Sequence, residues 1–281
     1  MNSELLYISW NPNEIALDLG IIDLRWYGLC WMIGLVLAVV LMARMCKEQK
    51  IDNELFNLLF MYSFFGILLG ARLGHCLFYE PNYYFSTWSR FTEMWLPIRF
   101  DRSSLGWQFI GYAGLASHGG MIGITISTWL YSRNTGVPFL KVVDMLGIVG
   151  PLTGCCIRLG NLMNSEIIGR VTDVPWAFIF EQVDSEPRHP GQLYEAIAYL
   201  LIFIYLWSKY RKSKEMIGSG RFIGITLVLV FTLRFFIEFI KERQVEFENT
   251  MALDMGQLLS IPFILLGGWF ILRSLTYTDS H

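Results

Sequence analysis

The sequence predicts an all-α integral membrane protein, a bundle of about seven transmembrane helices with structured outer loops. Of its 281 residues, 54% are hydrophobic, 16% aromatic and only 16% charged, and the mean hydropathy is +0.43. A soluble globular domain has about 25% charged residues. The second observation is a series of long apolar runs, and the third is that most charges lie in the short segments between those runs.

Seven of these runs are each long enough to cross roughly 30 Å of hydrocarbon as a helix. They cover residues 26–45, 55–79, 114–132, 140–163, 191–208, 222–240 and 256–275. The two longest connections, 80–113 and 164–190, are expected to be structured loops, and the first of them is rich in aromatic residues. No internal repeat is visible, so we expect residues 1–281 to form one transmembrane domain.

The Lys and Arg residues predict which side of the membrane each connection faces. No Lys or Arg precedes Arg25, whereas the loop after the first run contains Arg44, Lys47 and Lys50. The loop between the fifth and sixth runs contains Lys209, Arg211, Lys212, Lys214 and Arg221. Because cytoplasmic loops are enriched in Lys and Arg, we expect the N-terminus outside and, after seven spans, the C-terminus in the cytoplasm.

Small residues at four-residue spacing predict close helix contacts in two of the runs. Gly66, Gly70 and Gly74 share one face of the second run, and Gly150 and Gly154 share one face of the fourth.

Cysteine usage and net charge exclude several classes of function. The five cysteines are an odd number without CxxC or metal-ligand spacing, so we expect free thiols. No P-loop is present, and we predict neither a metal nor another cofactor. The formal net charge of −2 gives no reason to expect a nucleic-acid partner.

Polar residues gather at the outer end of every predicted span. An arginine at the bilayer centre costs about 2.5–3.5 kcal/mol on insertion scales, so each one needs a partner or a task. The residues at this end include Arg25, Tyr27, Arg72, His75, His118, Arg158, Asn161, His189, Gln192, Tyr194, Glu195, Arg234, Glu238, Gln257 and Ser260.

Two interpretations of this polar end differ in what the arginines do. One is a set of interhelical ion pairs and hydrogen bonds, which is the stronger interpretation for Arg72. The other is phosphate binding by arginine forks, which at the outer leaflet means lipid headgroups. Arg158 and Asn161 share a helix face, and Arg234 and Glu238 are spaced as an i,i+4 pair. These four residues favour a phospholipid-headgroup site.

The stretch CCIRLGNLMNSEIIG, residues 155–169, resembles the hallmark of the bacterial prolipoprotein diacylglyceryl transferase family, which runs approximately GRxGNFxNxExxG. RWYG at 25–28, SHGG at 117–120, HPGQLYE at 189–195, RFFIE at 234–238 and GQLLSIP at 256–262 also follow the family's order. The resemblance covers nearly the whole chain. Three positions depart from it: Ile157 replaces a glycine, Leu162 a phenylalanine, and Val230 a tyrosine that some members use.

The resemblance implies a catalytic membrane domain that transfers the diacylglyceryl group of phosphatidylglycerol to the lipobox cysteine thiol of a preprolipoprotein. The reaction forms a thioether and releases glycerol phosphate, the first step of bacterial lipoprotein maturation. The implied location is the bacterial cytoplasmic (inner) membrane. The implied partners are phosphatidylglycerol, preprolipoprotein signal peptides with a lipobox cysteine, and the lipid bilayer, with no cofactor.

The family's chemistry assigns roles to matching residues. His118 is the candidate base for the thiol, although another group is not excluded as the base. Arg158 and Arg234 would bind the donor phosphate and stabilise the leaving group, and Glu238 would orient Arg234. The expected substrate-binding residues are Tyr27, Gly119, Gly120, Asn161, Glu166, Gly169 and Glu238.

The alternative from another functional class is a lipid or organic-anion transporter or scramblase. It predicts polar residues reaching the inner half of the membrane and repeat symmetry, and neither is apparent in the sequence. A structural subunit would leave the outer polar residues unexplained, and no GxSG-type nucleophile of an intramembrane protease is present.

Overall fold

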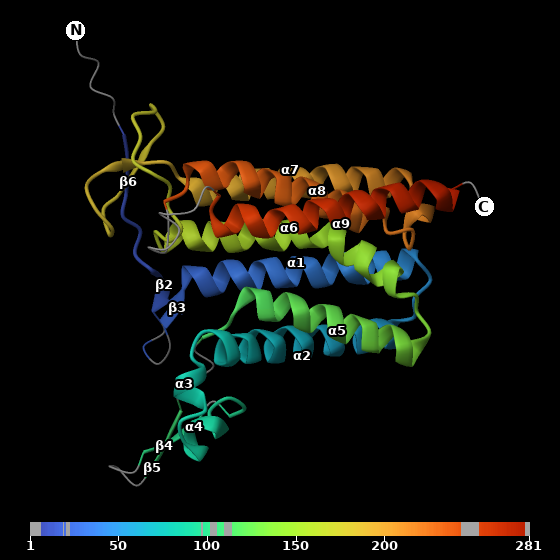
Figure 1. The fold of residues 1–281 in the computed structure, drawn as a ribbon, viewed down its shortest axis with the longest axis horizontal. Coiled ribbons are helices and arrows are strands. Elements are labelled where there is room, and N and C mark those ends of the chain that lie inside the picture. The colour runs from blue at the N-terminus through green and yellow to red at the C-terminus, as the bar shows by residue number, and fades with distance from the viewer. Residues whose placement is uncertain are drawn as a thin grey trace. The chain divides into compact units, whose positions relative to one another are not determined.

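The computed structural model describes residues 7–18, 20, 23–96, 98–101, 106–109, 114–242 and 253–278. The chain folds as two compact units. The larger unit contains residues 1–49 and 140–281, and the inserted unit contains residues 50–139. Both consist mainly of long helices, so the predicted all-α membrane fold is confirmed (Figure 1).

Five long helices form the larger unit and two the inserted unit, counted over the described residues. Those of the larger unit are α1 (Trp26–Glu48), α6 (Phe139–Met163), α7 (Gly191–Lys212), α8 (Arg221–Ile237) and α9 (Met255–Thr278). Those of the inserted unit are α2 (Asn53–Phe78) and α5 (Ser117–Thr135). All except α5 are long and apolar enough to cross a membrane.

Helix α5 differs from its predicted span, 114–132. It begins at Ser117 because Gly114 adopts a left-handed conformation with φ of +79°, which an α-helix cannot contain. It ends at Gly136, whose φ of +76° closes the last turn as a left-handed C-terminal cap. With 19 residues the helix is about 28 Å long. Among the seven long helices of the described residues, only α8, with 17 residues, is shorter than α5.

The glycines of α2 pack against α5 as their spacing predicts. A methyl group on Gly70 would collide with the carbonyl oxygen of Gly119, and one on Gly74 would lie 2.8 Å from the Gly119 Cα. The connection between the two helices contains α3 (Pro81–Tyr84), α4 (Trp88–Thr92) and the antiparallel hairpin of β4 (Ile98–Asp101) and β5 (Gly106–Phe109). The prediction that segment 80–113 contains structure is therefore confirmed for its described part.

A buried carboxylate joins two helices of the larger unit. Asp144 on α6 is fully buried and accepts hydrogen bonds of 2.9 Å from the backbone N–H groups of Gly218, Gly220 and Ile223. Ile223 lies in the first turn of α8, and Gly218 and Gly220 directly precede the helix. The start of a helix has unpaired N–H groups and a partial positive charge. The short turn η1 (Lys214–Met216) precedes them. Asp144 thus caps α8 and fixes its start against α6.

The glycines predicted to pack on α6 behave differently from each other. A Cβ on Gly154 would lie 3.1 Å from the ring of Tyr199 on α7, so this glycine allows close packing. A Cβ on Gly150 would meet no atom of the described residues within 4 Å, so the contact predicted at that position is wrong. The four-residue spacing identifies a face, but the neighbouring helix reaches only one of its two positions.

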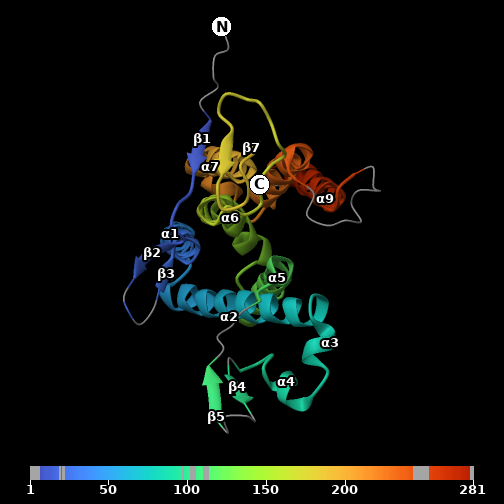
Figure 2. The same ribbon diagram turned by 90° about the vertical axis from the view of Figure 1, so that its left-hand side faces the viewer.

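A small sheet covers one end of the larger unit's helices, where α6 ends and α7 begins (Figure 2). Strand β1 (Ile8–Trp10) pairs in parallel with β6 (Phe178–Phe180), which pairs antiparallel with β7 (Pro187–Arg188). Phe178 and Phe180 pack with Leu162 and Ile168 in a buried cluster. A second pairing joins β2 (Ile15–Asp18) to β3 (Asp23–Arg25), directly before α1. The 164–190 segment is therefore a structured connection, as predicted.

Candidate functional site

Glu195, one turn into α7, is the centre of a buried charge cluster. Its carboxylate is fully buried and forms an ion pair with Arg158 on α6. Its other oxygen lies 2.8 Å from Nζ of Lys241, which follows α8. Lys241 also lies 3.3 Å from the carboxylate of Glu238. One buried acid therefore holds basic residues from two other parts of the larger unit at fixed positions.

The alternation of charges explains how this cluster tolerates burial. A single buried ion is very unfavourable, but a carboxylate between two cations recovers much of the lost hydration energy by Coulombic attraction and hydrogen bonds. Arg158 keeps 15% of its side chain exposed, whereas Lys241 keeps 7%. The guanidinium of Arg158 is thus the better placed of the two to meet a ligand.

A chain of hydrogen bonds connects Arg158 to the loop that follows α6. Arg158 donates to the Asn161 side chain at 3.1 Å, and Asn161 donates to Glu166 at 3.0 Å. Asn164 donates to the other Glu166 oxygen at 3.2 Å. The four polar residues of the stretch at 155–169 therefore form one network. Trp10 of β1 fixes the same helix end by donating to the Leu162 carbonyl at 2.9 Å.

Tyr27 lies at the start of α1 against α6. A Cβ on Gly160 would lie 3.0 Å from the Tyr27 ring, so the absence of a side chain at Gly160 lets the two helices approach. Tyr27 lies within electrostatic range of both Arg158 and Glu166. The structure therefore places Tyr27 with the residues that the sequence predicts as its neighbours in the site.

The predicted ion pair between Arg234 and Glu238 is not formed, and this expectation is wrong. The helix tightens into the 3-10 turn η2 (Glu238–Ile240), in which residues three apart lie on the same side. Glu238 therefore pairs with Lys241 at i,i+3. It also faces α9, because a Cβ on Gly256 would lie 2.6 Å from its carboxylate carbon.

Because Glu238 pairs with Lys241, the guanidinium of Arg234 is available for a ligand. Within residues 7–242 and 253–278, as far as they are described, its side chain makes no ion pair or hydrogen bond. It is half-buried and lies within electrostatic range of Tyr199. Tyr199 also lies within electrostatic range of Arg158 and Glu195.

Gly169 closes the loop after α6 by a tight backbone contact. Its N–H donates to the His189 carbonyl at 2.8 Å, and a Cβ there would lie 2.8 Å from the Ile240 carbonyl oxygen. His189 lies 3.2 Å from the Tyr194 hydroxyl, and burial lowers the pKa of its imidazole. Any side chain at position 169 would push this loop away from the segment that carries Lys241.

The loop bearing β7 is held in place by Arg188. This buried side chain hydrogen-bonds to Asp184 at 2.9 Å and to Glu242 at 2.9 Å. The hydrogen bond from Arg188 lowers the pKa of Asp184. Arg188 therefore joins the 164–190 connection to the chain just after Lys241.

The remaining predicted site residues belong to the inserted unit. The side chain of His118 is exposed at the start of α5, and Gly119 and Gly120 are buried in the same turn. Gly119 faces α2, so helix packing alone explains it. Arg72 donates to the Glu93 carbonyl at 2.7 Å and lies over the Tyr84 ring, 5.1 Å from its centroid. This fits the structural interpretation favoured for Arg72.

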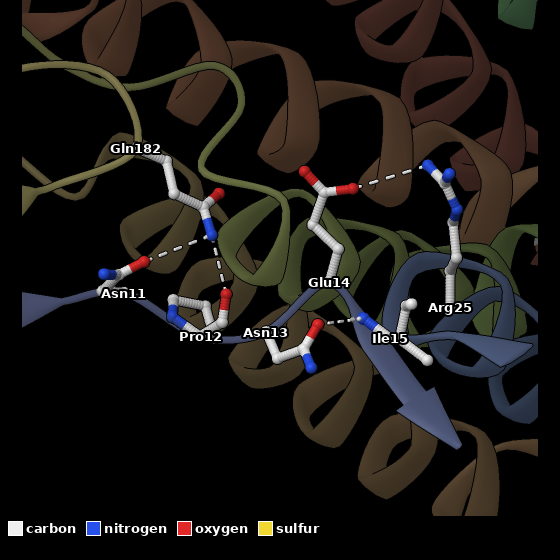
Figure 3. Close-up of a pocket in the computed structure, with 7 residues that line it drawn as sticks. All are labelled: Asn11, Pro12, Asn13, Glu14, Ile15, Arg25 and Gln182. Atoms are coloured by element: carbon white, nitrogen blue, oxygen red, sulfur yellow. Dashed lines mark hydrogen bonds and ion pairs between the residues drawn. The ribbon is translucent and has the colours of Figure 1, made fainter. Parts of the chain in front are cut away.

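An open pocket of about 460 Å³ lies beside the N-terminal segment of the larger unit (Figure 3). Gln182 spans it by donating to the Pro12 carbonyl at 2.7 Å, and Arg25 lies 3.4 Å from Glu14 across it. Its lining is Asn11, Pro12, Asn13, Glu14, Ile15, Arg25 and Gln182. None of the predicted site residues lines this pocket, so the pocket and the buried charge cluster are separate features.

Sequence reasoning assigned no role to Glu195, Lys241 or Tyr199. Glu195 stands in the HPGQLYE stretch, which points to the site, but an acid near a helix end also fits a simple solvated position. Lys241 lies just beyond the predicted sixth span. Its role depends on a pairing across three segments, which no local pattern encodes.

Comparison with known proteins gives a consistent result. The model of the family described as prolipoprotein diacylglyceryl transferase matches residues 14–273. A Bacteroides fragilis protein named phosphatidylglycerol–prolipoprotein diacylglyceryl transferase is 54% identical over 271 residues, covering 96% of each chain. Proteins of the same name from Chloroherpeton thalassium and Porphyromonas gingivalis are 40% and 38% identical, and the matches cover 94–95% of the chains.

Proposed function

The chain belongs to the prolipoprotein diacylglyceryl transferase family, and we propose that it transfers the diacylglyceryl group of phosphatidylglycerol to a prolipoprotein cysteine. The acceptor is the lipobox cysteine of a preprolipoprotein signal peptide. The products are a thioether-linked lipid and glycerol phosphate.

One observation supports this reaction most directly. Arg158 is held by a buried carboxylate, and Arg234, at the same end of the larger unit, makes no side-chain ion pair with a described residue. Two guanidinium groups near the ends of α6 and α8 suit an anion with several oxygens, such as a phosphodiester. The fully buried acid positions Arg158 without covering all of it.

The proposed chemical step is a displacement at carbon. The cysteine thiolate attacks the glyceryl carbon that bears the phosphate ester, a C–S bond forms, and the C–O bond breaks with its electron pair on glycerol phosphate. The leaving group gains negative charge as the bond breaks, and Arg158 and Arg234 stabilise this charge. His118 accepts the thiol proton, because an imidazole nitrogen is the side-chain group that most often acts as a general base.

The remaining predicted residues bind the headgroup or hold the arginines. Asn161 and Glu166 hold Arg158 through the hydrogen-bond network that begins at its guanidinium. Tyr27 lies within electrostatic range of Arg158 and Glu166 and would contact the headgroup beside them. Gly169 lets the loop after α6 pack closely against His189 and Ile240. Glu238 forms an ion pair with Lys241. Gly119 keeps α5 packed against α2, and Gly120 in the same turn would allow the lipid to approach the backbone beside His118.

The proposed orientation places the N-terminus outside the bacterial cytoplasmic membrane and the C-terminus in the cytoplasm. This follows from the Lys and Arg residues at 44–50 and 209–221. The end of the larger unit that contains Arg158 then faces the outer leaflet. Phosphatidylglycerol headgroups of that leaflet can reach it directly.

The test is a transfer assay with the purified full-length protein. Phosphatidylglycerol labelled in its acyl chains is mixed with a lipobox peptide, and the expected products are a thioether-linked peptide and free glycerol phosphate. A matched peptide with Ser in place of the lipobox Cys should yield neither. Movement of labelled lipid between leaflets without thioether formation would instead support the transporter or scramblase alternative.

A further inference from the structure

Gln192, at the second position of α7, is a fully buried amide without a partner. Its side chain has 0% exposure, and neither the amide nitrogen nor the amide oxygen forms a hydrogen bond with a described residue. Buried carboxamides are nearly always paired, because an unpaired donor or acceptor loses its hydrogen bonds to water. A pair of unsatisfied atoms on one side chain therefore requires an explanation.

The position of Gln192 connects it to the charge cluster. Residues 192, 195 and 199 are three and four apart and all buried, so they lie along one face of α7. Glu195 and Tyr199 on this face contact Arg158. A Cβ on the neighbouring Gly191 would lie 3.5 Å from the Lys241 side chain. Gln192 thus lies one turn from the groups proposed to bind the lipid phosphate.

The loop that packs on this end of α7 carries further signs of a ligand site. Ser165 and Ile167 have φ of +53° and +58°, a conformation that costs energy for residues other than glycine, above all for a β-branched one. The Ser165 hydroxyl and the side-chain amide oxygen (Oδ1) of Asn164 are also buried without hydrogen-bond partners among the described residues. Backbone strain and unpaired polar atoms of this kind concentrate at binding sites.

The chemistry of a carboxamide selects its partner. A phosphate oxygen only accepts hydrogen bonds, and the guanidinium groups already supply donors for it. A carboxamide both donates and accepts, which matches a hydroxyl group, since a hydroxyl also does both. The headgroup of phosphatidylglycerol ends in a glycerol with two hydroxyl groups beyond the phosphate.

We propose that the Gln192 amide hydrogen-bonds to the terminal glycerol hydroxyls of the donor lipid and so selects phosphatidylglycerol over phospholipids that lack them. This proposal rests on the proposed function, because it takes the donor to be phosphatidylglycerol. The loop at 164–169 lies beside the start of α7, with the Ile167 carbonyl oxygen 3.7 Å from the Gly191 Cβ position. The proposal therefore requires this loop to move aside when the headgroup binds.

Gln192→Met tests the proposal because it keeps the length of the side chain and removes only the amide. An amide that has no protein partner contributes nothing to folding, so the apparent melting temperature in detergent should equal or exceed that of the wild type. The KM for phosphatidylglycerol should rise about tenfold, as expected for one or two lost hydrogen bonds. Added phosphatidylglycerol should stabilise the wild type more than phosphatidic acid does, and the variant should lose this preference.

Gln257→Met is the matched control. Gln257 is equally buried, but its amide accepts from the Asp254 N–H at 3.0 Å and donates to the Phe235 carbonyl at 3.3 Å. This variant should melt at a lower temperature and keep the preference for phosphatidylglycerol.

A lowered melting temperature of Gln192→Met would overturn the proposal, because it would show a structural partner of the amide. An unchanged KM with an unchanged lipid preference would overturn it as well. Transfer by the wild type in the same assay shows separately whether the proposed function holds.

Discussion

Glu195 on α7 holds Arg158 on α6 by an ion pair in which the carboxylate is fully buried and the guanidinium is partly exposed. The pair fixes the arginine from its protein side and leaves its other side for a ligand. The predictions below test this arrangement and the reaction proposed for it.

Arg158→Lys keeps the positive charge but loses the planar fork that binds two phosphate oxygens at once. Transfer should fall by about 10²–10³, the usual cost of one lost contact to a developing oxyanion. Arg90→Lys is the control, because the exposed Arg90 side chain hydrogen-bonds to Ser86 and lies over the Tyr83 ring, away from the residues proposed to act. Near-normal transfer by purified, folded Arg158→Lys would contradict the clamp.

Glu195→Gln removes the negative charge between Arg158 and Lys241. Breaking a buried ion pair from one side leaves an uncompensated charge, so the free energy of unfolding should fall by about 3–5 kcal/mol. Glu242→Gln should cost no more than about 1 kcal/mol, since Glu242 is half-exposed where it meets Arg188. Equal losses in denaturant titrations of the two variants would argue against a central role for Glu195.

His118→Gln should lower transfer at neutral pH by about 10²–10⁴, the usual contribution of a general base. The deficit should shrink as the pH rises from about 7 to 9, because a substrate thiol of pKa about 8.5 then ionises without help. The measurement is the ratio of wild-type to variant rates across this range. A ratio independent of pH would assign the proton to another group.

A labelling experiment tests the proposed orientation. In a cysteine-free background, Ser185→Cys in the loop before β7 should react with an impermeant thiol reagent in intact cells. Ser213→Cys at the end of α7 should be protected until the membrane is made permeable. The opposite pattern would place the Arg158 end of the larger unit in the cytoplasm.

The cysteine-free background is itself a prediction. Four of the five cysteines are buried, Cys30 is partly buried, and all are free thiols. Because the reacting sulfur belongs to the substrate, a variant with all five changed to Ser or Ala should retain transfer, with some loss of stability from altered packing. Loss of activity in a folded variant would point to a covalent enzyme intermediate.

Several features of the protein could be read from the sequence because the physics behind them is local. A helix that crosses a membrane must be apolar over about 20 consecutive residues, so six of the seven predicted spans match helices that meet this condition. The link from Arg158 to Asn161 follows from the three-residue spacing of one helix. The match at 155–169 identified the family without any knowledge of the fold.

The tertiary structure decided which charges pair. Spacing predicted that Glu238 would hold Arg234, but the 3-10 turn at the end of α8 directs Glu238 to Lys241. Glu195 finds its cations on α6 and after α8, at separations of 37 and 46 residues along the chain. Such pairs form only when helices distant in sequence pack together. The energy of a buried charge depends on those neighbours, and a linear pattern does not contain them.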